Sequence, residues 1–327
     1  MKALLLTVVF LLAAPIPPRA FVFGRTSEKL AAERLGAMRT AFEAGDCPAA
    51  LEISGAFLNE APPHRMREQA YGYLGQCYER GGLTDKAISL YKLALELFPE
   101  NTQFAQRLAE IYNKSGFYES AVPLLLKTLT LKNNDTGANL GLARAYYGLG
   151  FLGKAKELYS KIAALQNYSV PEVMREYASC LLKQRNWAEV STVIAKGAES
   201  EPEEAFWPLM SARVLAGQGN YQKAVPAMDA ALRLAPSRQK RLERALYLVL
   251  GGRPAQAIEV ADAELSAGGG DMLAASVKAL ALYSIGEKNQ AEPYFTAAAA
   301  AGGTFAGKLA AAFLAVGKNG GQGACKK

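Results

Sequence analysis

The chain has 327 residues, of which half are hydrophobic, with a formal net charge of +7 and a single histidine, His64. A hydrophobic fraction this high excludes an intrinsically disordered tail protein. With one histidine, histidine-based metal sites, serine triads and cysteine–histidine pairs are nearly excluded, because each needs a well-placed imidazole. The length indicates either two domains of ordinary size or one elongated array of repeats.

The first twenty residues have the pattern of a secretory signal peptide. Lys2 precedes an apolar run over residues 3–14, which is followed by three prolines and Ala20. The run is shorter than the roughly 20 residues that a membrane-spanning helix needs, and the prolines would stop a helix. We predict a signal peptide over residues 1–20, a linker over 21–30, and export to the periplasm or the secreted space. Anchoring to the membrane by an uncleaved N-terminal segment is the alternative.

The balance of charge argues against nucleic acid as a partner. Removing residues 1–20 takes two cations and no acid from the formal charge of +7, which leaves +5. No cluster of lysine and arginine of the kind that binds phosphate backbones is present. No second long apolar segment follows the first, so a membrane contact is expected only through the N-terminal segment.

A small residue recurs through the chain at intervals of 33 to 37 residues, at Ala50, Ala87, Ala121, Ala155, Val190, Ala224, Ala257 and Ala291. A glycine stands five residues before seven of these eight positions, at Gly45, Gly82, Gly116, Gly150, Gly219, Gly252 and Gly286, and Arg185 is the exception. A proline follows some of the units. This order predicts a helix, a glycine turn, a second helix and a proline stop.

Residues 68–101 form the clearest copy of the repeat. Its first helix carries Tyr71, Leu74, Gly75 and Tyr78 on one face, and its second carries Ala87, Tyr91 and Ala94. This spacing predicts an antiparallel helix pair in which small residues allow close backbone approach. The pattern resembles the tetratricopeptide repeat, TPR, and the resemblance extends over more than four-fifths of the chain.

The resemblance implies an all-α fold, a right-handed α-solenoid of about eight helix-turn-helix repeats. The predicted units span residues 31–64, 68–101, 102–135, 136–169, 171–204, 205–238, 239–271 and 272–303. We expect the array to occupy residues 31–302, a capping helix 303–317 and a flexible tail 318–327. The capping helix is predicted from the spacing of Phe305, Leu309, Phe313 and Val316, and it would cover the last exposed face of the solenoid.

Two further motifs need interpretation within this frame. Residues 148–155 match the glycine spacing of nucleotide-binding loops, but Ala155 stands where a phosphate loop needs Ser or Thr, and a helix precedes the segment. We therefore interpret it as a repeat turn.

Cys47 begins one helix and Cys77 nears the end of the next, and antiparallel packing in a TPR-like stack would bring these ends together. A Cys47–Cys77 disulfide is expected in an exported chain, and two free buried thiols are the alternative.

The resemblance also implies a concave groove that receives a peptide or helix of another protein. The polar side chains expected to line it are Tyr73, Gln76, Gln106, Arg107, Glu110, Asn113, Arg144, Tyr147, Arg175, Ser179 and Arg213. Such a surface suits hydrogen bonds to an extended peptide. The family's clamp for chaperone C-termini uses Lys, Asn and Arg at fixed groove positions. The sequence does not reproduce this pattern, because those positions hold Gly72, Gln76, Arg107 and Gly137. Alternatively, these side chains are simply solvated and binding occurs at an edge or on the convex face.

The predicted function is a non-catalytic scaffold for protein–protein interaction in the cell envelope or the secreted space. A membrane-anchored assembly factor for an envelope machine is the alternative. An enzyme is a remote one, because no nucleophile, base or cofactor motif stands in a suitable context. No catalytic residue, metal or cofactor is expected.

Overall fold

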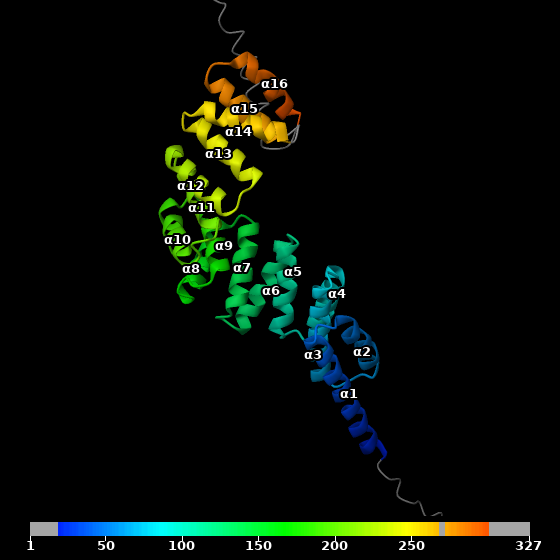
Figure 1. The fold of residues 1–327 in the computed structure, drawn as a ribbon. Coiled ribbons are helices and arrows are strands. Elements are labelled where there is room, and N and C mark those ends of the chain that lie inside the picture. Colours follow the sequence, from blue (N-terminus) through cyan, green and yellow to red (C-terminus); the bar gives the residue numbers. More distant parts are fainter. Residues whose placement is uncertain (1–18, 268–271, 301–327) are drawn as a thin grey trace, which may run out of the picture. The chain divides into compact units, whose positions relative to one another are not determined.

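The computed structural model describes residues 19–267 and 272–300, and these form sixteen α-helices and no strand (Figure 1). In chain order the helices are α1 (Arg19–Glu43), α2 (Cys47–Asn59), α3 (His64–Arg80), α4 (Thr84–Leu97), α5 (Thr102–Lys114), α6 (Tyr118–Leu131), α7 (Thr136–Gly148), α8 (Leu152–Leu165), α9 (Pro171–Lys183), α10 (Trp187–Ser200), α11 (Phe206–Gly217), α12 (Tyr221–Leu234), α13 (Arg238–Leu250), α14 (Pro254–Ala267), α15 (Met272–Ser284) and α16 (Lys288–Ala299).

Several predicted segments lie outside this part of the chain. The signal peptide does so except for its last two residues, as do the capping helix over 303–317 and the tail over 318–327. None of the described helices has the length and apolarity needed to cross a membrane.

The predicted linker over residues 21–30 is helical in the structure. α1 begins at Arg19 and continues without interruption to Glu43, so the linker and the first helix of the first repeat form one element. The reason is local, because no proline occurs between Arg19 and Asp46 to stop the helix. Residues 21–30 are therefore part of α1.

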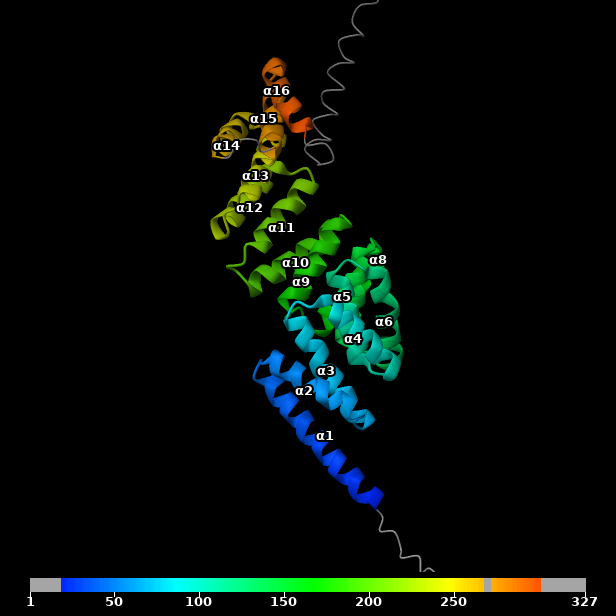
Figure 2. The ribbon, with the colours of Figure 1, turned by 90° about the vertical axis from the view of Figure 1, so that its right-hand side faces the viewer.

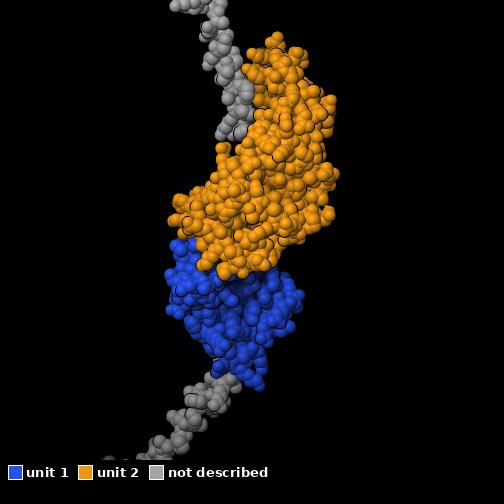
Figure 3. Space-filling model, turned by 90° about the vertical axis from the view of Figure 1, so that its left-hand side faces the viewer, with its two compact units in different colours: residues 1–145 blue, residues 146–327 orange. Residues whose placement is uncertain are grey.

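The sixteen helices follow one another as helix-turn-helix hairpins, and the chain divides into two compact units, residues 1–145 and 146–327, with the boundary inside α7 (Figure 3). We call these the N-terminal unit and the C-terminal unit. Within each, a helix packs against the next one along the chain, as α3 does against α4 and α4 against α5, or α11 against α12 and α12 against α13 (Figure 2). First helices of successive hairpins also touch, as α1 does α3 and α9 does α11. Contacts restricted to near neighbours in sequence define an all-α solenoid.

The turn within each hairpin uses a left-handed backbone conformation. All seven glycines that the repeat frame assigns to the turn have positive φ angles, between 67° and 91°. Arg185, the sequence exception, occupies the same place with φ of 58°. The geometry of the turn is thus kept even where the residue type disfavours it.

The column of small residues forms the centre of each hairpin. All eight of its members, from Ala50 to Ala291, are fully buried, with 0% of their surface exposed. Large aromatic side chains fill the space beside them. Tyr91 of α4 covers Gly75 of α3, and Trp207 of α11 covers Gly197 of α10, and in both places a Cβ atom on the glycine would overlap the ring. These glycines are therefore required by packing.

Candidate functional site

The residues expected to line the groove belong to first helices in both units. Those of the N-terminal unit lie on α3, α5 and α7, and they are Tyr73, Gln76, Gln106, Arg107, Glu110, Asn113 and Arg144. Those of the C-terminal unit lie at the end of α7, on α9 and on α11, and they are Tyr147, Arg175, Ser179 and Arg213. Because each unit is described by itself, the two sets are considered separately.

In the N-terminal unit the first helices enclose two adjoining pockets, with volumes of about 360 and 280 Å³. The larger is lined by Gly72, Gln76, Tyr91, Gln103, Phe104, Gln106, Arg107 and Glu110. The smaller shares Gly72, Gln76, Gln103 and Phe104 with it, and adds Glu68, Gln69, Tyr73 and Asn101. We call the two together the α3–α5 pocket. Five of the eleven residues predicted for the groove line it, namely Tyr73, Gln76, Gln106, Arg107 and Glu110.

Arg107 lies in this pocket with its side chain 45% exposed. Its guanidinium makes only long ion pairs, 3.8 Å to Glu79 and 3.8 Å to Glu110. Each carboxylate has a closer partner, because the Tyr91 hydroxyl donates to Glu79 at 2.6 Å and the Lys114 ammonium lies 2.8 Å from Glu110. The donors of Arg107 are therefore not saturated by the protein.

The ionisation of the pocket follows from these neighbours. Partial burial by itself would raise the pKa of Glu110, but Lys114, Arg107 and Arg144 together lower it below the ordinary value. Burial, reinforced by the hydrogen bond to Glu79, raises the pKa of the Tyr91 hydroxyl. At neutral pH, Glu110 is thus an anion and Tyr91 a neutral donor.

Two of the remaining residues of this set have structural contacts of their own. The Asn113 amide donates to the backbone carbonyl of Gly141 at 2.8 Å, which ties α5 to α7. The Tyr73 ring lies on Phe42 of α1, with ring centroids 5.1 Å apart. Asn113 therefore joins neighbouring helices, whereas Tyr73 contributes both to packing and to the pocket.

In the C-terminal unit the predicted arginines are held by close carboxylates. Arg213 forms a two-pronged pair with Glu243 of α13, at 2.9 and 3.0 Å, and these hydrogen bonds raise the pKa of Arg213 above its ordinary value. Arg175 contacts Glu201 at 2.5 Å and Glu204 at 3.8 Å. These two arginines act as ties between neighbouring elements.

The other two residues of this set also have intramolecular partners. The Ser179 hydroxyl donates to the backbone carbonyl of Arg175 at 2.8 Å. Lys183 lies over the Tyr147 ring, 4.7 Å from its centroid. The set predicted for the C-terminal unit is thus engaged within the protein.

Seven residues of the α3–α5 pocket were not predicted for the groove from the sequence, namely Glu68, Gln69, Gly72, Tyr91, Asn101, Gln103 and Phe104. The glutamines repeat at helical spacing, Gln69 with Gln76 and Gln103 with Gln106, which places each pair on one helix face. That spacing was the available signal. Gly72 had been noted only as a departure from the chaperone clamp.

Comparison with known proteins identifies the repeat. Two family models described as tetratricopeptide repeat match the chain, one at residues 68–111 and the other at residues 140–189 and 209–271. The chain therefore contains tetratricopeptide repeats in both units. A search of curated proteins found no match.

Solved structures of TPR proteins share the fold. A tetratricopeptide repeat protein from Parabacteroides merdae superposes with a TM-score of 0.61 at 17% identity, covering 74% of this chain and 98% of that one. PilW, a widely conserved type IV pilus biogenesis factor, superposes with a TM-score of 0.55 at 18% identity, covering 62% of this chain and 93% of that one. PilF of Pseudomonas aeruginosa superposes with a TM-score of 0.51 at 18% identity, covering 66% of this chain and 96% of that one. At these identities the likeness concerns the fold. The TPR fold is generally that of a scaffold for protein–protein interaction.

The TPR frame also accounts for the glycine-rich segment over residues 148–155. α7 ends at Gly148, the turn passes through Gly150, and α8 begins at Leu152. A helix precedes the segment, whereas a phosphate loop follows a strand. The segment is a repeat turn. Within the described residues, no three His, Cys, Asp or Glu side chains lie together as metal ligands would.

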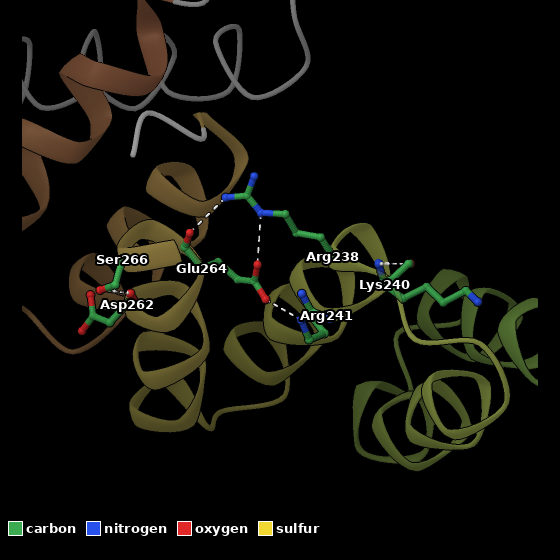
Figure 4. A network of polar contacts seen from close by, with 7 residues as sticks. Arg238, Lys240, Arg241, Asp262, Glu264 and Ser266 are labelled. Atoms are coloured by element: carbon green, nitrogen blue, oxygen red, sulfur yellow. Dashed lines mark hydrogen bonds and ion pairs between the residues drawn. The ribbon is translucent and has the colours of Figure 1, made fainter. Parts of the chain in front are cut away.

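The basic side chains at the start of α13 have partners within the protein (Figure 4). Arg238 and Arg241 both bind Glu264 of α14, which is only 7% exposed, with Arg238 Nε 3.0 Å from Glu264 Oε2. Lys240 donates to the backbone carbonyl of Ala235 at 2.7 Å. Hydrogen bonding to Arg241, followed by that to Arg238, lowers the pKa of Glu264. This cluster ties α13 to α14.

The three cysteines within the described residues divide into a pair and a single thiol. The structure joins Cys47 of α2 and Cys77 of α3 as a disulfide, with Cα atoms 5.2 Å apart, which is the pairing expected from antiparallel packing. Cys180 is buried and unpaired, and its burial raises the pKa of the thiol to about 11. Such a thiol is unreactive at neutral pH.

Proposed function

We propose that this TPR protein is an exported, non-catalytic scaffold that holds a peptide or helix of another protein against its first helices. The observation that carries the proposal is the α3–α5 pocket, where Arg107 makes only long ion pairs and the side chains of Gln69, Gln103 and Gln106 make no internal hydrogen bond. Elsewhere on the first helices, Arg175 and Arg213 are tied to carboxylates. The N-terminal unit therefore presents the recognition surface.

Export is proposed from the pattern of residues 1–20, and the Cys47–Cys77 pair supports it. Disulfides persist in oxidising compartments such as the periplasm and the extracellular space, and they are rare in the cytosol. A cytosolic chain would carry both cysteines as thiols. The state of these two cysteines in the cell therefore reports the compartment.

The second candidate is a membrane-anchored assembly factor that organises an envelope machine. The course of α1 supports this candidate, because the helix begins at Arg19, just after the prolines that follow the apolar run, and continues into the repeats without a break. If residues 1–18 stay attached, this helix would connect the repeats directly to the membrane.

In-cell crosslinking tests both candidates. A photoreactive residue is placed at Gln76 in the pocket and, as the matched control, at exposed Glu96 on α4, and the captured proteins and the N-terminus of the chain are identified by mass spectrometry. The scaffold account predicts a discrete partner at Gln76 only and a chain without residues 1–20. Crosslinks at Glu96 alone contradict binding on the first helices. An intact N-terminus with crosslinks to membrane proteins favours the anchored assembly factor.

A further inference from the structure

The turns within the hairpins of the C-terminal unit are rich in cations. The ten residues that end at each member of the small-residue column, 146–155, 181–190, 215–224, 248–257 and 282–291, contain six cations and two carboxylates. The cations are Lys154, Lys183, Arg185, Lys223, Arg253 and Lys288, and all six are exposed. None of them forms an ion pair with a carboxylate of the described residues. These turns therefore present unneutralised positive charge to the solvent.

The carboxylates in and near these turns do not cancel that charge. Glu189 is bound by Lys156, Tyr177 and Asn186, and Glu287 accepts a hydrogen bond from the Gln290 amide. The next carboxylates are on the second helices, at Glu157, Glu259 and Glu292. Each stands at least four positions after the start of its helix, so it lies at least one helical turn, about 5.4 Å, behind the turn.

Printed contacts between neighbouring turns place them along one edge of the unit. The Cys180 thiol, at the end of α9, lies 3.7 Å from the carbonyl oxygen of Leu152 at the start of α8. The Trp187 ring, at the start of α10, covers Gly217 at the end of α11. Tyr221 and Leu250 line one hollow of about 420 Å³ between the next two turns, and α13 contacts α15. We call this row of turns the basic edge.

The corresponding turns of the N-terminal unit carry the opposite charge. Residues 41–50, 78–87 and 112–121 contain three cations and five carboxylates. The same repeat frame therefore produces an acidic row of turns in one unit and a basic one in the other. The difference concerns residues that the frame leaves free, because the turn glycines and the small-residue column are shared by both units.

Helix stability does not explain the cations of the basic edge. Lys154 and Lys223 are the third residues of α8 and α12, Lys288 is the first residue of α16, and Arg253 directly precedes α14. The helix dipole favours anions at these positions and disfavours cations. None of these four helices has an acidic residue in its first turn. The cations thus occupy positions at which they weaken the fold.

Large apolar side chains stand exposed between these cations. Phe151 is 54% exposed, and Leu250 and Ile285 are each 50% exposed. Phe151 is the N-cap of α8 and makes no capping hydrogen bond, whereas Asn186 and Asn220 cap α10 and α12 with their side chains. An exposed ring in place of a capping amide gives up helix stability. Cations mixed with exposed apolar side chains are typical of surfaces that lie at a lipid interface.

We propose that the basic edge of the C-terminal unit docks on the surface of an anionic phospholipid membrane. The charges are complementary, because single cations spread over five turns match the diffuse negative charge of lipid headgroups, and Phe151, Leu250 and Ile285 would enter the interface between them. This inference goes beyond the proposed function, since it concerns the other unit and a lipid partner. The sequence shows no basic cluster because each turn contributes only one or two of the cations.

The test measures sedimentation with lipid vesicles. The predicted mature chain, residues 21–327, is used, so that the apolar run over residues 3–14 cannot bind lipid. One set of vesicles is pure phosphatidylcholine, and the other contains about one-third phosphatidylglycerol. The edge variant is Lys154→Gln/Lys223→Gln/Arg253→Gln. Its matched control is Lys92→Gln/Lys127→Gln/Lys132→Gln, which removes three exposed cations from α4 and α6.

The wild type should bind the anionic vesicles, with an affinity that falls as salt is added, and should not bind pure phosphatidylcholine. Each cation removed from the edge should weaken binding about fivefold, so the edge variant should bind about a hundredfold more weakly. The control variant should bind as the wild type does. The edge variant should also melt at or above the temperature of the wild type, because it removes cations from helix starts.

The apolar contribution is tested by Phe151→Asn against Phe117→Asn. Phe117 is the uncapped N-cap of α6 in the N-terminal unit and is 59% exposed. Both substitutions supply a capping side chain and should maintain or raise the Tm. Only Phe151→Asn should weaken binding to the anionic vesicles.

Several results would overturn the inference. Equal binding to both kinds of vesicle would exclude recognition of anionic lipid, and equal losses in the edge and control variants would assign binding to net charge. Release of the vesicles by inorganic phosphate at constant ionic strength would indicate a site for a single phosphate group. If no vesicle is bound and a photoreactive residue at Phe151 captures an acidic protein in the cell, the basic edge is a protein interface instead.

Discussion

The two units use the same repeat frame for different ends. In the N-terminal unit, Arg107 faces a pocket and its nearest carboxylates lie 3.8 Å away. In the C-terminal unit, Arg213 is locked to Glu243 by two hydrogen bonds of 2.9 and 3.0 Å. An arginine on a first helix is thus available for recognition in one unit and serves as a tie in the other. The difference depends on how closely the neighbouring hairpin places its carboxylate, 3.8 Å for Glu79 and 2.9 Å for Glu243.

The units also differ in how they close their cores. The N-terminal unit has a disulfide between α2 and α3. The described part of the C-terminal unit relies instead on Trp207 packed over Gly197, and on the buried Glu264 cluster. A substitution in one of these contacts should therefore destabilise its own unit first, because contacts in a solenoid reach only near neighbours.

The largest effect is expected for Trp207→Ala. Trp207 is 1% exposed, and its indole nitrogen donates to Glu201 at 3.2 Å. Removing such a side chain costs about 3–5 kcal/mol of stability. Hydrogen exchange followed by mass spectrometry should show lost protection in α10 to α12, with α2 to α4 still protected. Equal loss in both units would contradict the separation between them.

Reduction of the Cys47–Cys77 bond should have the next largest effect. The bond closes a loop of 30 residues, and cross-links of this size stabilise folded proteins by about 2–4 kcal/mol. We expect a reductant to lower the Tm of the N-terminal unit and to leave that of Cys47→Ala/Cys77→Ala unchanged. Alkylation that labels both thiols in material taken directly from the cell would refute both the bond and the oxidising compartment.

Gly75→Ala should destabilise the N-terminal unit by about 1–3 kcal/mol, the usual cost of overpacking. The added methyl would overlap the Tyr91 ring. At Gly72, by contrast, an added Cβ would meet only Phe104, at 3.8 Å. Denaturant unfolding of this variant beside Gly72→Ala sharpens the contrast between a glycine required by packing and one that is not. Equal stability of the two variants would show that Tyr91 can move aside at little cost.

The smallest effect concerns acid stability of the C-terminal unit. The pKa of Glu264 is lowered in the folded state by Arg241 and Arg238, so its ionised form stabilises the fold at neutral pH, and this contribution is lost as the pH falls through the folded-state pKa. The Tm of Glu264→Gln should lie below that of the wild type at pH 7. The difference in Tm between the variant and the wild type should become smaller below about pH 4. A gap that is independent of pH would assign the effect to packing alone.

Much of the fold could be predicted from the sequence because the repeat places the same demand on every hairpin. The small-residue column is fully buried, and the turn glycines all adopt positive φ angles. Arg185 takes the place of a turn glycine and adopts a positive φ angle as well, so the repeat frame holds even where the residue type differs. The start of the first helix was harder to place, because no proline in residues 21–30 interrupts α1.

The site was predicted less completely, for a physical reason. Whether an arginine is available depends on carboxylates of neighbouring hairpins, such as Glu243, which is 30 positions from Arg213. Periodicity places both on their helices but does not pair them. Gly72 was missed because the sequence does not distinguish it from Gly75, whereas the position of the Tyr91 ring does.

The most direct test compares Arg107→Ala with Arg213→Ala, measuring for each the Tm and the affinity for a peptide selected on the wild type. The account predicts that Arg107→Ala keeps its Tm, since its ion pairs are long and exposed, and binds the peptide at least about tenfold more weakly. Arg213→Ala should melt earlier and bind with unchanged affinity. If Arg213→Ala loses binding while Arg107→Ala retains it, the recognition surface does not lie on the N-terminal unit.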